Sequence, residues 1–572
     1  MLIEAHTVDQ DTLIESDICV VGCGPAGLTL IKDLIPTGIR ICAIESGGRN
    51  FEQSAQDLSE GTTISPDRYP SHLLMAARRR QLGGTANLWD DELNAGEGDE
   101  LVRLLPLDEI DFEKRTWIPH SGWPFDKSEL DPFYERGLRL SGAGPLTYEV
   151  SSWKSRYTEL PIPAARVRTM MSQFGLRSIF TRDLPNELAS AENVHVYLDA
   201  TLLELILNED RVEHARIAAA PGREFQISAK IFVLAAGGIE NARLLLLSNS
   251  AQRHALGNQH DLVGRFFMDH PAFRLGVLTP ADSKLFRSVA LYDHHVVNGV
   301  PVMGKLTFCE EVMRREHMLN IGATLTPRGR DYESHAANVV RRMAKSKSTA
   351  AAAKLLRGEF RSIVTGLDEV LLNGYARLTK KKPRYSENKG GWSRLQNSER
   401  RFRKFEVSCL AEQSPIPDNR VTLSNDQDRF GQRKVELHWR WSEIDLRSIR
   451  RAQEILKEEV EQCALGKFET QAELDQGKPP LVTSPHHHLG TTRMHTNPRE
   501  GVVDANGRVH GIPNLYLAGS SVFPTGGFAN PTLTIIALTL RLSYHLKALM
   551  KSPASSVSPS HPHSPDQSAS RP

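Results

Sequence analysis

The chain has 572 residues, of which 40% are hydrophobic and 24% are charged. These proportions lie close to the globular average, and they exclude wholesale disorder and a collagen-like repeat. Lysine and arginine total 70 against 69 acidic residues, for a formal net charge of +1. The overall charge therefore gives no sign of a polyanionic partner. At roughly 150 residues a domain, the length alone favours three or four domain-sized units.

The first predicted unit occupies residues 17–48 and reads DICVVGCGPAGLTLIKDLIPTGIRICAIESGG. A short apolar run with branched side chains over 18–21 predicts a buried parallel strand. The glycine pattern G-x-G-x-x-G follows, then a helix over 28–35 and a second strand over 39–44. Strand, turn, helix and strand together form a βαβ unit of the length that dinucleotide sites have.

Each residue type in this unit has a physical role. Gly22 permits the tight turn, Gly24 lets backbone amides approach a pyrophosphate, and Gly27 lets the helix pack close to the sheet. The N-terminus of the helix carries a partial positive charge that attracts the diphosphate. Glu45, at the end of the second strand, is placed to accept hydrogen bonds from a ribose diol. The unit predicts a dinucleotide site, and NAD and FAD both stay open because they share the pattern.

Residues 193–249 predict a small β-meander that leads into another glycine turn. Three alternating or apolar segments are separated by the turn signals NED and PGRE. An apolar strand over 231–234 is then followed by AAGG at 235–238 and a leucine-rich helix. Taken alone, this turn is either part of a nucleotide site or an ordinary corner between a strand and a helix.

Residues 486–546 contain HHHLGTTRM and, further on, GFANPTLT. A short strand over 515–518 is predicted to enter Gly519 and Ser520. Pro531 suits the first turn of the long apolar helix that follows, and Asn530 suits its N-cap. Capping alone is therefore one explanation of Asn530.

Together these motifs resemble the glucose–methanol–choline (GMC) family of FAD oxidoreductases. Within that family, GWPFDKSELDPFYERG and RRQLGGTANLWDDEL look most like the pyranose oxidase, gluconate dehydrogenase and fructose dehydrogenase branch. The resemblance implies an α/β fold with a discontinuous Rossmann-like FAD-binding domain and a mostly antiparallel β-sheet substrate domain carrying helices. The matching segments, in family order, are the first glycine turn with Glu45, AAGGIENARLLLLS (235–248), LVGRFFMDHP (262–271), HHLGTTRM and GFANPTLT.

The interleaving of the matching segments predicts two intertwined domains. The FAD-binding domain is expected to consist of residues 14–95, 190–271 and 486–550. The substrate-binding domain is expected to consist of residues 96–189 and 272–485, with a basic insertion at 341–404. Residues 551–572 are rich in serine and proline and are interpreted as a disordered tail.

The resemblance implies oxidation of a CH–OH group, in a sugar-like or other alcohol substrate, by hydride transfer to flavin N5. His487 matches the histidine of the family pattern H-x-x-G-T, which implies that it is the general base. A neutral imidazole with an ordinary pKa of about 6.5 can accept a hydroxyl proton near neutral pH. Asn530 stands at the second catalytic position, where its amide can hold the substrate oxygen without a change of charge.

The resemblance also implies a set of residues that contact FAD. Leu88 stands where pyranose oxidases commonly carry a flavin-linking histidine, so we expect FAD to be bound non-covalently. Asn87 is expected to hydrogen-bond the flavin or the substrate. The complete expected set is Gly22, Gly24, Gly27, Glu45, Gly83, Gly84, Asn87, Val196, Ala236, Gly519, Ser520, Pro531 and Thr532.

The three consecutive histidines 486–488 do not predict a metal site, because in an extended segment only two of them share a face. No nearby cysteine or carboxylate spacing completes a zinc site. The six cysteines are scattered and are interpreted as small buried side chains in a reducing compartment. The N-terminus lacks a secretory signal, and the longest apolar run is broken by Arg541. We therefore expect a soluble, cytoplasmic protein.

The net charge of +1 hides an uneven distribution. Residues 341–404 hold 18 lysines and arginines against five acids, a local balance of 18 − 5 = +13. A solvated insertion is one interpretation of this stretch. The other is a docking face for an acidic electron-accepting protein or an anionic membrane surface. Nucleic acid is not expected as a partner, because no reader motif accompanies the charge.

Two other classes of function stay open. One is a non-redox lyase of the same fold that retains FAD for structure. The other is an NAD-binding dehydrogenase or a non-catalytic nucleotide-binding module, which would need only the N-terminal βαβ unit. The segments around His487 and Asn530, together with VGRFFMDHP, argue against this last class. Oxygen, a quinone and a protein remain alternative electron acceptors.

Overall fold

The predicted N-terminal βαβ unit is confirmed by β2 (Leu13–Val21), α1 (Pro25–Leu34) and β3 (Ile41–Ile44). The computed structural model describes residues 1–551 apart from 66, 68, 90, 95–96, 154, 251–254, 330–390, 396–397, 471–478 and 481–485. Helix α1 begins at Pro25, earlier than expected, because the proline suits the first helical turn and directly follows the glycine turn.

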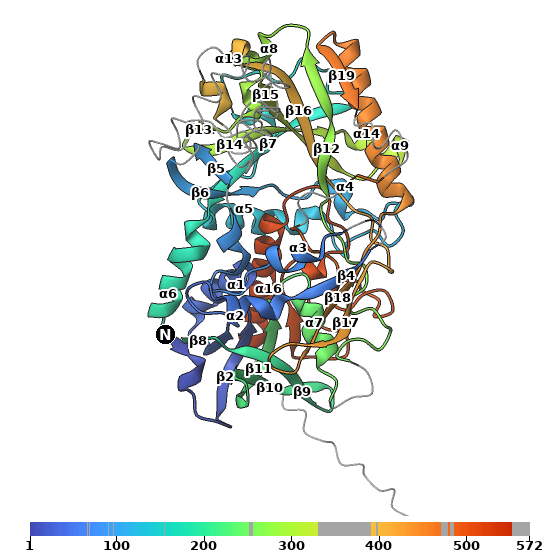
Figure 1. The fold of residues 1–572 in the computed structure, drawn as a ribbon. Helices are drawn as coiled ribbons and strands as arrows, with labels where there is room; N and C mark the ends of the chain where they lie inside the picture. Colours follow the sequence, from blue (N-terminus) through green and yellow to red (C-terminus); the bar gives the residue numbers. More distant parts are fainter. Residues whose placement is uncertain are drawn as a thin grey trace, which may run out of the picture.

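These strands belong to a mixed sheet in the lower half of Figure 1. Strands β1, β8, β3, β2, β11 and β20 pair in parallel, whereas β9, β10 and β11 form the predicted antiparallel meander. Strands β3 and β20 and the apolar ends of β2 and β11 are buried on both faces, as their continuous apolar sequences require. The remaining strands are β1 (Leu2–Glu4), β8 (Val194–Leu198), β9 (Thr201–Asn208), β10 (Arg211–Ala220), β11 (Arg223–Leu234) and β20 (Leu515–Leu517).

A second sheet lies above the first in Figure 1, and all its strand pairs are antiparallel. The expected fold class, a Rossmann-like α/β part with an antiparallel part, is therefore confirmed. The strands are β5 (Asp91–Asn94), β6 (Glu97–Leu104), β7 (Val167–Leu176), β12 (Ala272–Pro280), β13 (His295–Val297), β14 (Val300–Phe308), β15 (Ile321–Gly329), β16 (Phe402–Ala411) and β19 (Gly466–Thr470).

A small third sheet joins the predicted domains. Strand β4 (Gly61–Ile64) pairs in parallel with β18 (Arg433–His438), which pairs in antiparallel with β17 (Arg420–Gln427). β4 lies in a predicted FAD-binding segment, whereas β17 and β18 lie in a predicted substrate-binding segment. The predicted domain boundaries stay a prediction. Most of the basic stretch 341–404 and nearly all of the predicted tail fall outside the described residues, so their interpretation also stays a prediction.

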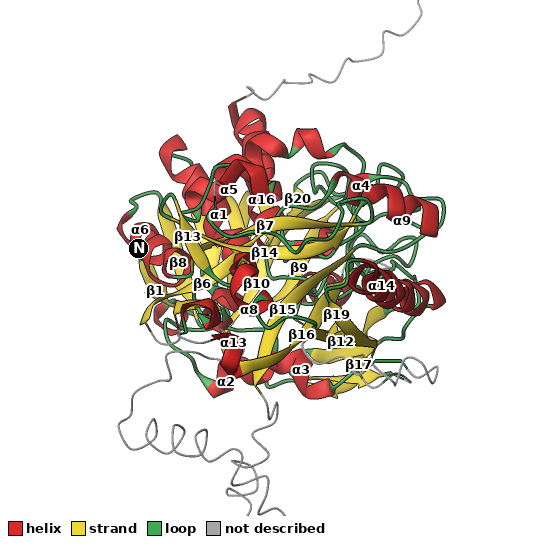
Figure 2. Ribbon diagram, turned by 90° about the horizontal axis from the view of Figure 1, so that it is seen from above, coloured by secondary structure: helices red, strands yellow, loops and turns green. Residues whose placement is uncertain are grey.

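The C-terminal helix α16 (Thr532–Lys551) packs against both α1 and α5 (Asp131–Leu140), and Figure 2 shows the three helices close together. Gly137 allows the close approach, because a Cβ there would lie 3.0 Å from a methyl carbon of Ile536. By length and composition α16 is apolar enough to cross a membrane, but 56% of its apolar window is buried inside the protein. Its apolar sequence is thus used for packing in the core.

Helix α14 (Glu443–Gln462) covers the antiparallel sheet with its apolar face. Ser442 begins it with a capping box, since its hydroxyl accepts the Asp445 N–H while the Asp445 carboxylate accepts the Ser442 N–H. The shorter helices are α2 (Gln53–Gln56), α3 (Ser71–Ala76), α4 (Glu109–Phe112), α6 (Leu184–Ser190), α7 (Glu240–Leu247), α8 (Leu285–Ser288), α9 (Glu310–Glu316) and α13 (Ser398–Arg401).

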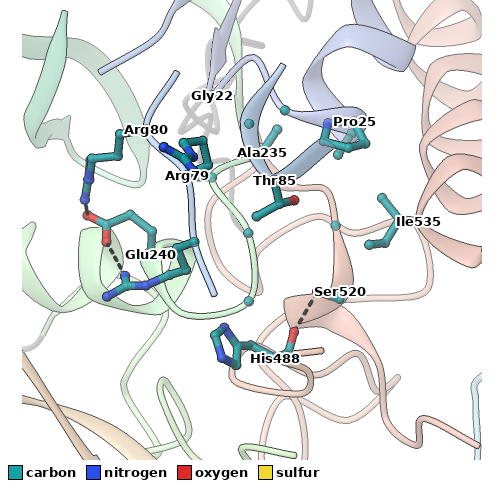
Figure 3. A pocket seen from close by; sticks show the side chains of 18 of the residues that line it. Gly22, Pro25, Arg79, Arg80, Thr85, Ala235, Glu240, His488, Ser520 and Ile535 are labelled. Carbon is teal, nitrogen blue, oxygen red and sulfur yellow. Dashed lines mark hydrogen bonds and ion pairs between the residues drawn. The ribbon is translucent and has the colours of Figure 1, made fainter. Parts of the chain in front are cut away.

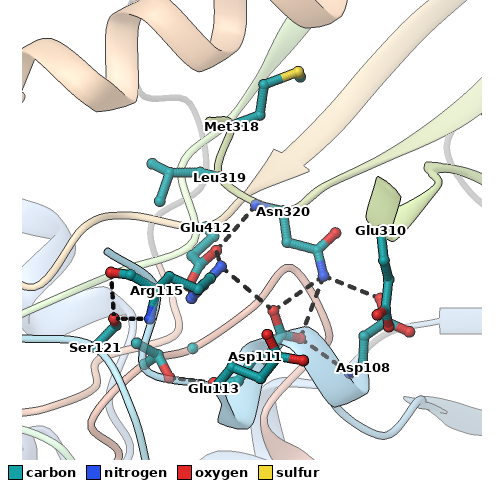
Figure 4. A network of polar contacts seen from close by, with 12 residues as sticks. Asp108, Asp111, Glu113, Arg115, Ser121, Glu310, Met318, Leu319, Asn320 and Glu412 are labelled. Atoms are coloured by element: carbon teal, nitrogen blue, oxygen red, sulfur yellow. Dashed lines mark hydrogen bonds and ion pairs between the residues drawn. The ribbon is translucent and has the colours of Figure 1, made fainter. Parts of the chain in front are cut away.

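A buried network of charges, shown in Figure 4, ties α4 to the antiparallel sheet. Arg115 donates through both terminal nitrogens to Glu412, and both side chains are 0% exposed. Glu412 also accepts the Asn320 N–H at 3.0 Å. The side-chain amide of Asn320 donates to Asp108 and to Asp111.

The same network supports the loop before α16. The Thr525 hydroxyl donates to the Asp111 carbonyl oxygen. A Cβ at Gly527 would lie only 2.3 Å from a carboxylate oxygen of Asp111, so this glycine lets the loop approach the network closely. The position of the loop thus depends on α4 and on the charges around it.

Candidate active site

A cavity of about 600 Å³ lies where the glycine turns of the mixed sheet converge. Figure 3 shows its wall from close by. The first glycine turn, the AAGG turn after β11 and the segment after β20 all contribute, because the carboxyl ends of parallel strands meet at one edge of a sheet. The expected site residues that line it are Gly22, Gly24, Glu45, Gly84, Ala236, His487, Gly519, Ser520, Asn530, Pro531 and Thr532.

The first glycine turn is closed by contacts that only glycine permits. Gly22 has a φ of +100°, and a Cβ there would lie 2.8 Å from the Ala235 carbonyl oxygen. A Cβ at Gly27 would lie 1.9 Å from the Gly22 carbonyl oxygen. The predicted roles of these two glycines are confirmed, because one permits the turn and the other the close packing of helix on strand.

A single extra methyl group at position 27 is expected to remove the cofactor. Because a backbone oxygen occupies the required space, Gly27→Ala has to displace the turn, at a cost of about 1–3 kcal/mol of folding free energy. The flavin-to-protein absorbance ratio of the purified variant should fall to near zero.

Gly222→Ala is the matched control. Gly222 also has a positive φ of +76°, but nothing lies within 4 Å of its added Cβ. This variant should lose about 1–2 kcal/mol through backbone strain and keep its flavin. A Gly27→Ala protein with full flavin content and wild-type stability would contradict the assignment of the turn.

Glu45 lies buried under the first turn, at the end of β3. Its carboxylate accepts the Cys23 N–H at 2.9 Å and the Gly47 N–H at 3.0 Å. Burial raises the pKa of this carboxyl to about 7, against the lowering effect of these two hydrogen bonds. Each oxygen accepts one of these two hydrogen bonds, and a carboxylate oxygen can accept more than one, so this cavity-lining carboxylate can also bind a pair of hydroxyl groups.

Four residues of the expected cofactor set do not line the cavity. Val196 is wrong as a cofactor contact, because its side chain is 0% exposed within β8, in the core of the sheet. Asn87 is corrected as well, since its amide donates to the Leu82 and Gly84 carbonyl oxygens. The N–H of Gly83 donates to the Cys23 carbonyl oxygen, so Gly83 supports the first glycine turn. The fourth, Gly27, acts through packing.

A charged cluster that the sequence did not predict joins two of the turns. Arg80 lies 2.9 Å from a carboxylate oxygen of Glu240 and donates to the Ser46 hydroxyl at 2.9 Å. Arg243 also pairs with Glu240, at 2.8 Å. These arginines hold the pKa of the Glu240 carboxyl far below its usual range, against the raising effect of burial. The sequence does show three consecutive arginines, 78–80, shortly before Gly83 and Gly84. No spacing rule, however, connects these arginines to Glu240.

His487 and Asn530, 43 residues apart in the sequence, meet at the cavity wall. The Nε2 atom of His487 lies 3.4 Å from Nδ2 of Asn530. The Nδ1 atom of His487 lies 3.1 Å from Nδ1 of His270. Burial lowers the pKa of His487 well below its ordinary value, and the neighbouring histidines and Lys305 lower it further. His487 is therefore a neutral imidazole near neutral pH.

Asn530 is not the N-cap that its position before the helix suggested. Helix α16 begins at Thr532, and the Ile535 N–H donates to the Pro531 carbonyl oxygen, which places Pro531 at the N-cap. Asn530 lies one residue earlier. Its Oδ1 atom is buried and has no hydrogen-bond partner among the described residues. A buried amide oxygen without a partner is a position that a ligand hydroxyl can satisfy.

Asp269 organises the histidine segment, and sequence reasoning missed it. Its carboxylate is 0% exposed and accepts the His487 N–H at 2.9 Å, the His270 N–H at 2.7 Å and the Tyr69 hydroxyl at 2.8 Å. Burial raises the pKa of this carboxyl to about 6, against the lowering effect of the hydrogen bonds. Asp269 and His270 stand in the segment MDHP, which is the signal that could have identified them.

Residues 415–539 match the family model described as GMC oxidoreductase. The paromamine 6'-oxidase of Streptomyces fradiae is 24% identical over 94% of this chain and 93% of that protein. The 2-methyl-1,2-propanediol dehydrogenase of Mycolicibacterium austroafricanum is 25% identical over 92% of this chain and 94% of that protein. The large subunit of the fructose dehydrogenase of Gluconobacter japonicus is 28% identical over 55% of this chain, and the match spans about half of that protein, 47%.

Two solved structures share the fold. Formate oxidase aligns with a TM-score of 0.52 at 16% identity, over 95% of this chain and 100% of that chain. Pyridoxine 4-oxidase from Mesorbium loti aligns with a TM-score of 0.53 at 13% identity, over 93% of this chain and 99% of that chain. The glycine turns, the histidine and asparagine at the cavity and the relatives agree with the family model, which identifies residues 415–539 as a GMC oxidoreductase domain.

Proposed function

We propose that this protein oxidises a CH–OH group of a sugar-like or other alcohol substrate, with FAD as the hydride acceptor and His487 as the general base. The observation that carries the proposal is the pairing of the neutral, buried His487 with the Asn530 amide on the wall of a cavity built from dinucleotide-type glycine turns. Two relatives that match over more than 90% of this chain, a paromamine 6'-oxidase and a 2-methyl-1,2-propanediol dehydrogenase, support an alcohol substrate.

The residues of the cavity fit FAD. Gly22 and Gly24 line the cavity at the N-terminus of α1, where the free backbone N–H groups of a helix suit a diphosphate. The Glu45 carboxylate has lone pairs for the ribose diol. FAD, when bound, supplies an isoalloxazine ring that accepts a hydride. His487 and Asn530 line the same cavity as the Glu45 end, so one extended ligand can reach both.

We propose that His487 takes the hydroxyl proton of the substrate at Nε2 while hydride leaves the carbon. Asn530 lies beside this atom, where its Nδ2 can donate to the substrate oxygen. Because an amide stays neutral, it can hold this oxygen both as alcohol and as carbonyl. A positioned general base typically contributes about 10² to 10⁴ in rate.

The depressed pKa of His487 makes a prediction for the pH profile. The base must be neutral to act, and burial holds its pKa well below 6.5. The rate of flavin reduction should therefore stay on its plateau as the pH falls through 6.5 and decline only at lower pH. Stopped-flow reduction across a pH series measures this. An acid limb with its midpoint at or above pH 6.5 would contradict the proposed environment of the base.

Non-covalent binding of FAD is expected because Leu88 lines the cavity and its aliphatic side chain offers no atom for a covalent bond. Acid precipitation of the holoenzyme should leave all the yellow flavin in the supernatant. Flavin fluorescence on the polypeptide after denaturing electrophoresis would show that another side chain forms the link.

Anaerobic addition of candidate substrates tests the proposed function. The panel contains sugars, amino sugars and 1,2-diols, and the readout is bleaching of the flavin absorbance. Oxidation of a CH–OH group predicts bleaching with at least one of them. Product formation with unchanged flavin absorbance would instead favour the lyase. Readmitting air to the reduced enzyme then distinguishes an oxidase, which reoxidises quickly, from a dehydrogenase.

A further inference from the structure

We propose that His270 is a positioning residue that fixes the tautomer of His487, so that the unprotonated Nε2 of His487 faces the cavity. The proposal rests on the proposed function and adds a residue to it. The His270 imidazole lies between the Gly526 carbonyl oxygen, 3.2 Å from its Nε2, and the His487 ring, 3.1 Å from its Nδ1. The two rings meet edge to face, with an interplanar angle of 79°.

The hydrogen-bond partners decide where each proton lies. A carbonyl oxygen only accepts, so the contact with Gly526 requires the His270 proton on Nε2. A neutral imidazole carries one N–H, which leaves Nδ1 of His270 as an acceptor. The facing Nδ1 of His487 must then be the donor. The other ring nitrogen of His487, Nε2, is left with a free lone pair.

His270 can accept a hydrogen bond at Nδ1 only while it is neutral, and its surroundings keep it neutral. The residue is 1% exposed, and burial lowers its pKa to about 3, with a further lowering effect from Lys305. The groups that face His487 act in the same direction: His270, His486, His488 and Lys305 all lower its pKa. The Asp269 carboxylate accepts hydrogen bonds from the backbone N–H groups of His270 and His487 and from the Tyr69 hydroxyl.

The contact on the other side of His487 agrees with this assignment. Nδ2 of Asn530, a donor, lies 3.4 Å from Nε2 of His487, which the tautomer makes an acceptor. With Nε2 protonated instead, two donors would face each other there. A substrate hydroxyl that donates to Nε2 and accepts from Nδ2 of Asn530 completes the arrangement.

Hydrogen bonds to the backbone of His270 and of His487 hold the two imidazole rings beside each other. One carboxylate, that of Asp269, accepts the N–H of His270 and the N–H of His487. The loop passes close to the outer ring, since a Cβ at Gly526 would lie 3.0 Å from Nε2 of His270. His270 therefore has little freedom to turn away from the Gly526 carbonyl oxygen.

The proton balance needs no transfer to His270. The O–H bond of the substrate breaks and its proton goes to Nε2 of His487. The C–H bond breaks and its electron pair leaves with the hydride to the flavin, while the C=O double bond forms. His487 becomes an imidazolium whose Nδ1–H continues to donate to Nδ1 of His270. His270 keeps its own proton on Nε2 throughout.

Two substitutions separate the tautomer role from a structural one. His270→Phe keeps a ring but removes the acceptor, and it should slow flavin reduction about 10- to 100-fold, the usual effect of losing a group that orients a functional histidine. The direction follows the loss seen when a catalytic histidine is held in the wrong tautomer. His270→Asn places an amide oxygen near the position of Nδ1, and it should restore the rate to within a few-fold of wild type. Flavin content is measured for both variants.

The outcomes are distinct. Wild-type flavin reduction in His270→Phe, or equal losses in both variants, would overturn the proposal. If His487→Ala also reduced its flavin at the wild-type rate, the proposed function itself would fail, so the two failures can be told apart.

A second measurement uses the wild-type holoenzyme and does not depend on how the variants fold. Neutron diffraction should place deuterium on Nδ1 of His487 and on Nε2 of His270, and none on Nε2 of His487. Deuterium on Nε2 of His487 or on Nδ1 of His270 would overturn the proposal.

Discussion

Replacing His487 by alanine is expected to slow anaerobic flavin reduction by a factor of about 10² to 10⁴, the usual contribution of a positioned general base. His487 is the buried, neutral imidazole at the cavity wall, and its Nε2 faces the Asn530 amide. The alanine variant leaves the glycine turns and Glu45 untouched. It should therefore bind FAD as the wild type does and lose only the rate.

A control variant and a chemical rescue sharpen this experiment. His72→Ala is the control, because His72 is exposed on α3 and its loss should change nothing. Imidazole added to the buffer should restore part of the rate of the His487→Ala enzyme, since the deleted group leaves a space of its own shape. An unchanged rate with a true substrate would remove His487 from the mechanism.

Replacing Arg115 by methionine is expected to cost about 3–5 kcal/mol of the free energy of unfolding. Arg115 and Glu412 are both 0% exposed, and Asp111 lies 4.0 Å from the guanidinium. Without Arg115, the Glu412 and Asp111 carboxylates are buried with no charge of opposite sign in direct contact among the described residues. Thermal or urea unfolding of the holoenzyme measures the loss.

The pH dependence of this loss has a definite sign. Burial already raises the pKa of the Asp111 carboxyl well above its ordinary value, with a further effect from Glu412, and Arg115 lowers it. Removing Arg115 raises the folded-state pKa of the Asp111 carboxyl further. The folded state then binds more protons than the unfolded state, so its stability falls as the pH rises. The variant should lose more stability at pH 8 than at pH 5.

Two variants test whether the effect belongs to the buried pair. Removing both charges, with Arg115→Met and Glu412→Met together, should recover part of the loss because no charge of that pair stays buried alone. Arg139→Met is the exposed counterpart. Arg139 pairs with Glu135 at 3.5 Å with exposures of 66% and 52%, and its loss should cost less than about 1 kcal/mol. Equal effects of the buried and exposed substitutions would contradict the role given to the network.

The sequence predicted best those features that depend on neighbours along the chain. The βαβ unit, with Gly22, Gly27 and Glu45, needs only a strand, a turn and a helix in succession, and all three residues lie as expected. The meander of β9, β10 and β11 could be predicted for the same reason, because turn residues next to each strand separate it from the following one. His487 and Asn530 could be identified only because the family resemblance connected two distant segments.

The features that the sequence missed are decided by tertiary contacts. Val196 was expected beside the cofactor, but the order of the strands places β8 between β1 and β3, inside the sheet. Asn87 carries a suitable amide, but its own turn uses that amide. Asn530 was expected at the N-cap, but the helix begins one residue later than expected, so that Pro531 is the N-cap.

The roles of Asp269 and His270 could not be predicted from the sequence for the same reason. Asp269 and His270 stand in the segment MDHP, far from His487 in the sequence. Their roles follow from hydrogen bonds that span more than two hundred residues. No periodicity or spacing rule reports such contacts, because they arise only when the segment before β12 and the segment before β20 meet at the cavity.

We propose that this chain oxidises an alcohol by moving a hydride from carbon to FAD beside His487. The most direct test of this proposal is a single anaerobic turnover of the holoenzyme with a substrate alcohol, unlabelled and then carrying deuterium at the carbinol carbon. The flavin should bleach with both substrates, and deuterium should slow the bleaching several-fold, because this C–H bond breaks in the step observed. Product formed without any bleaching, or the same bleaching rate for both substrates, would contradict it.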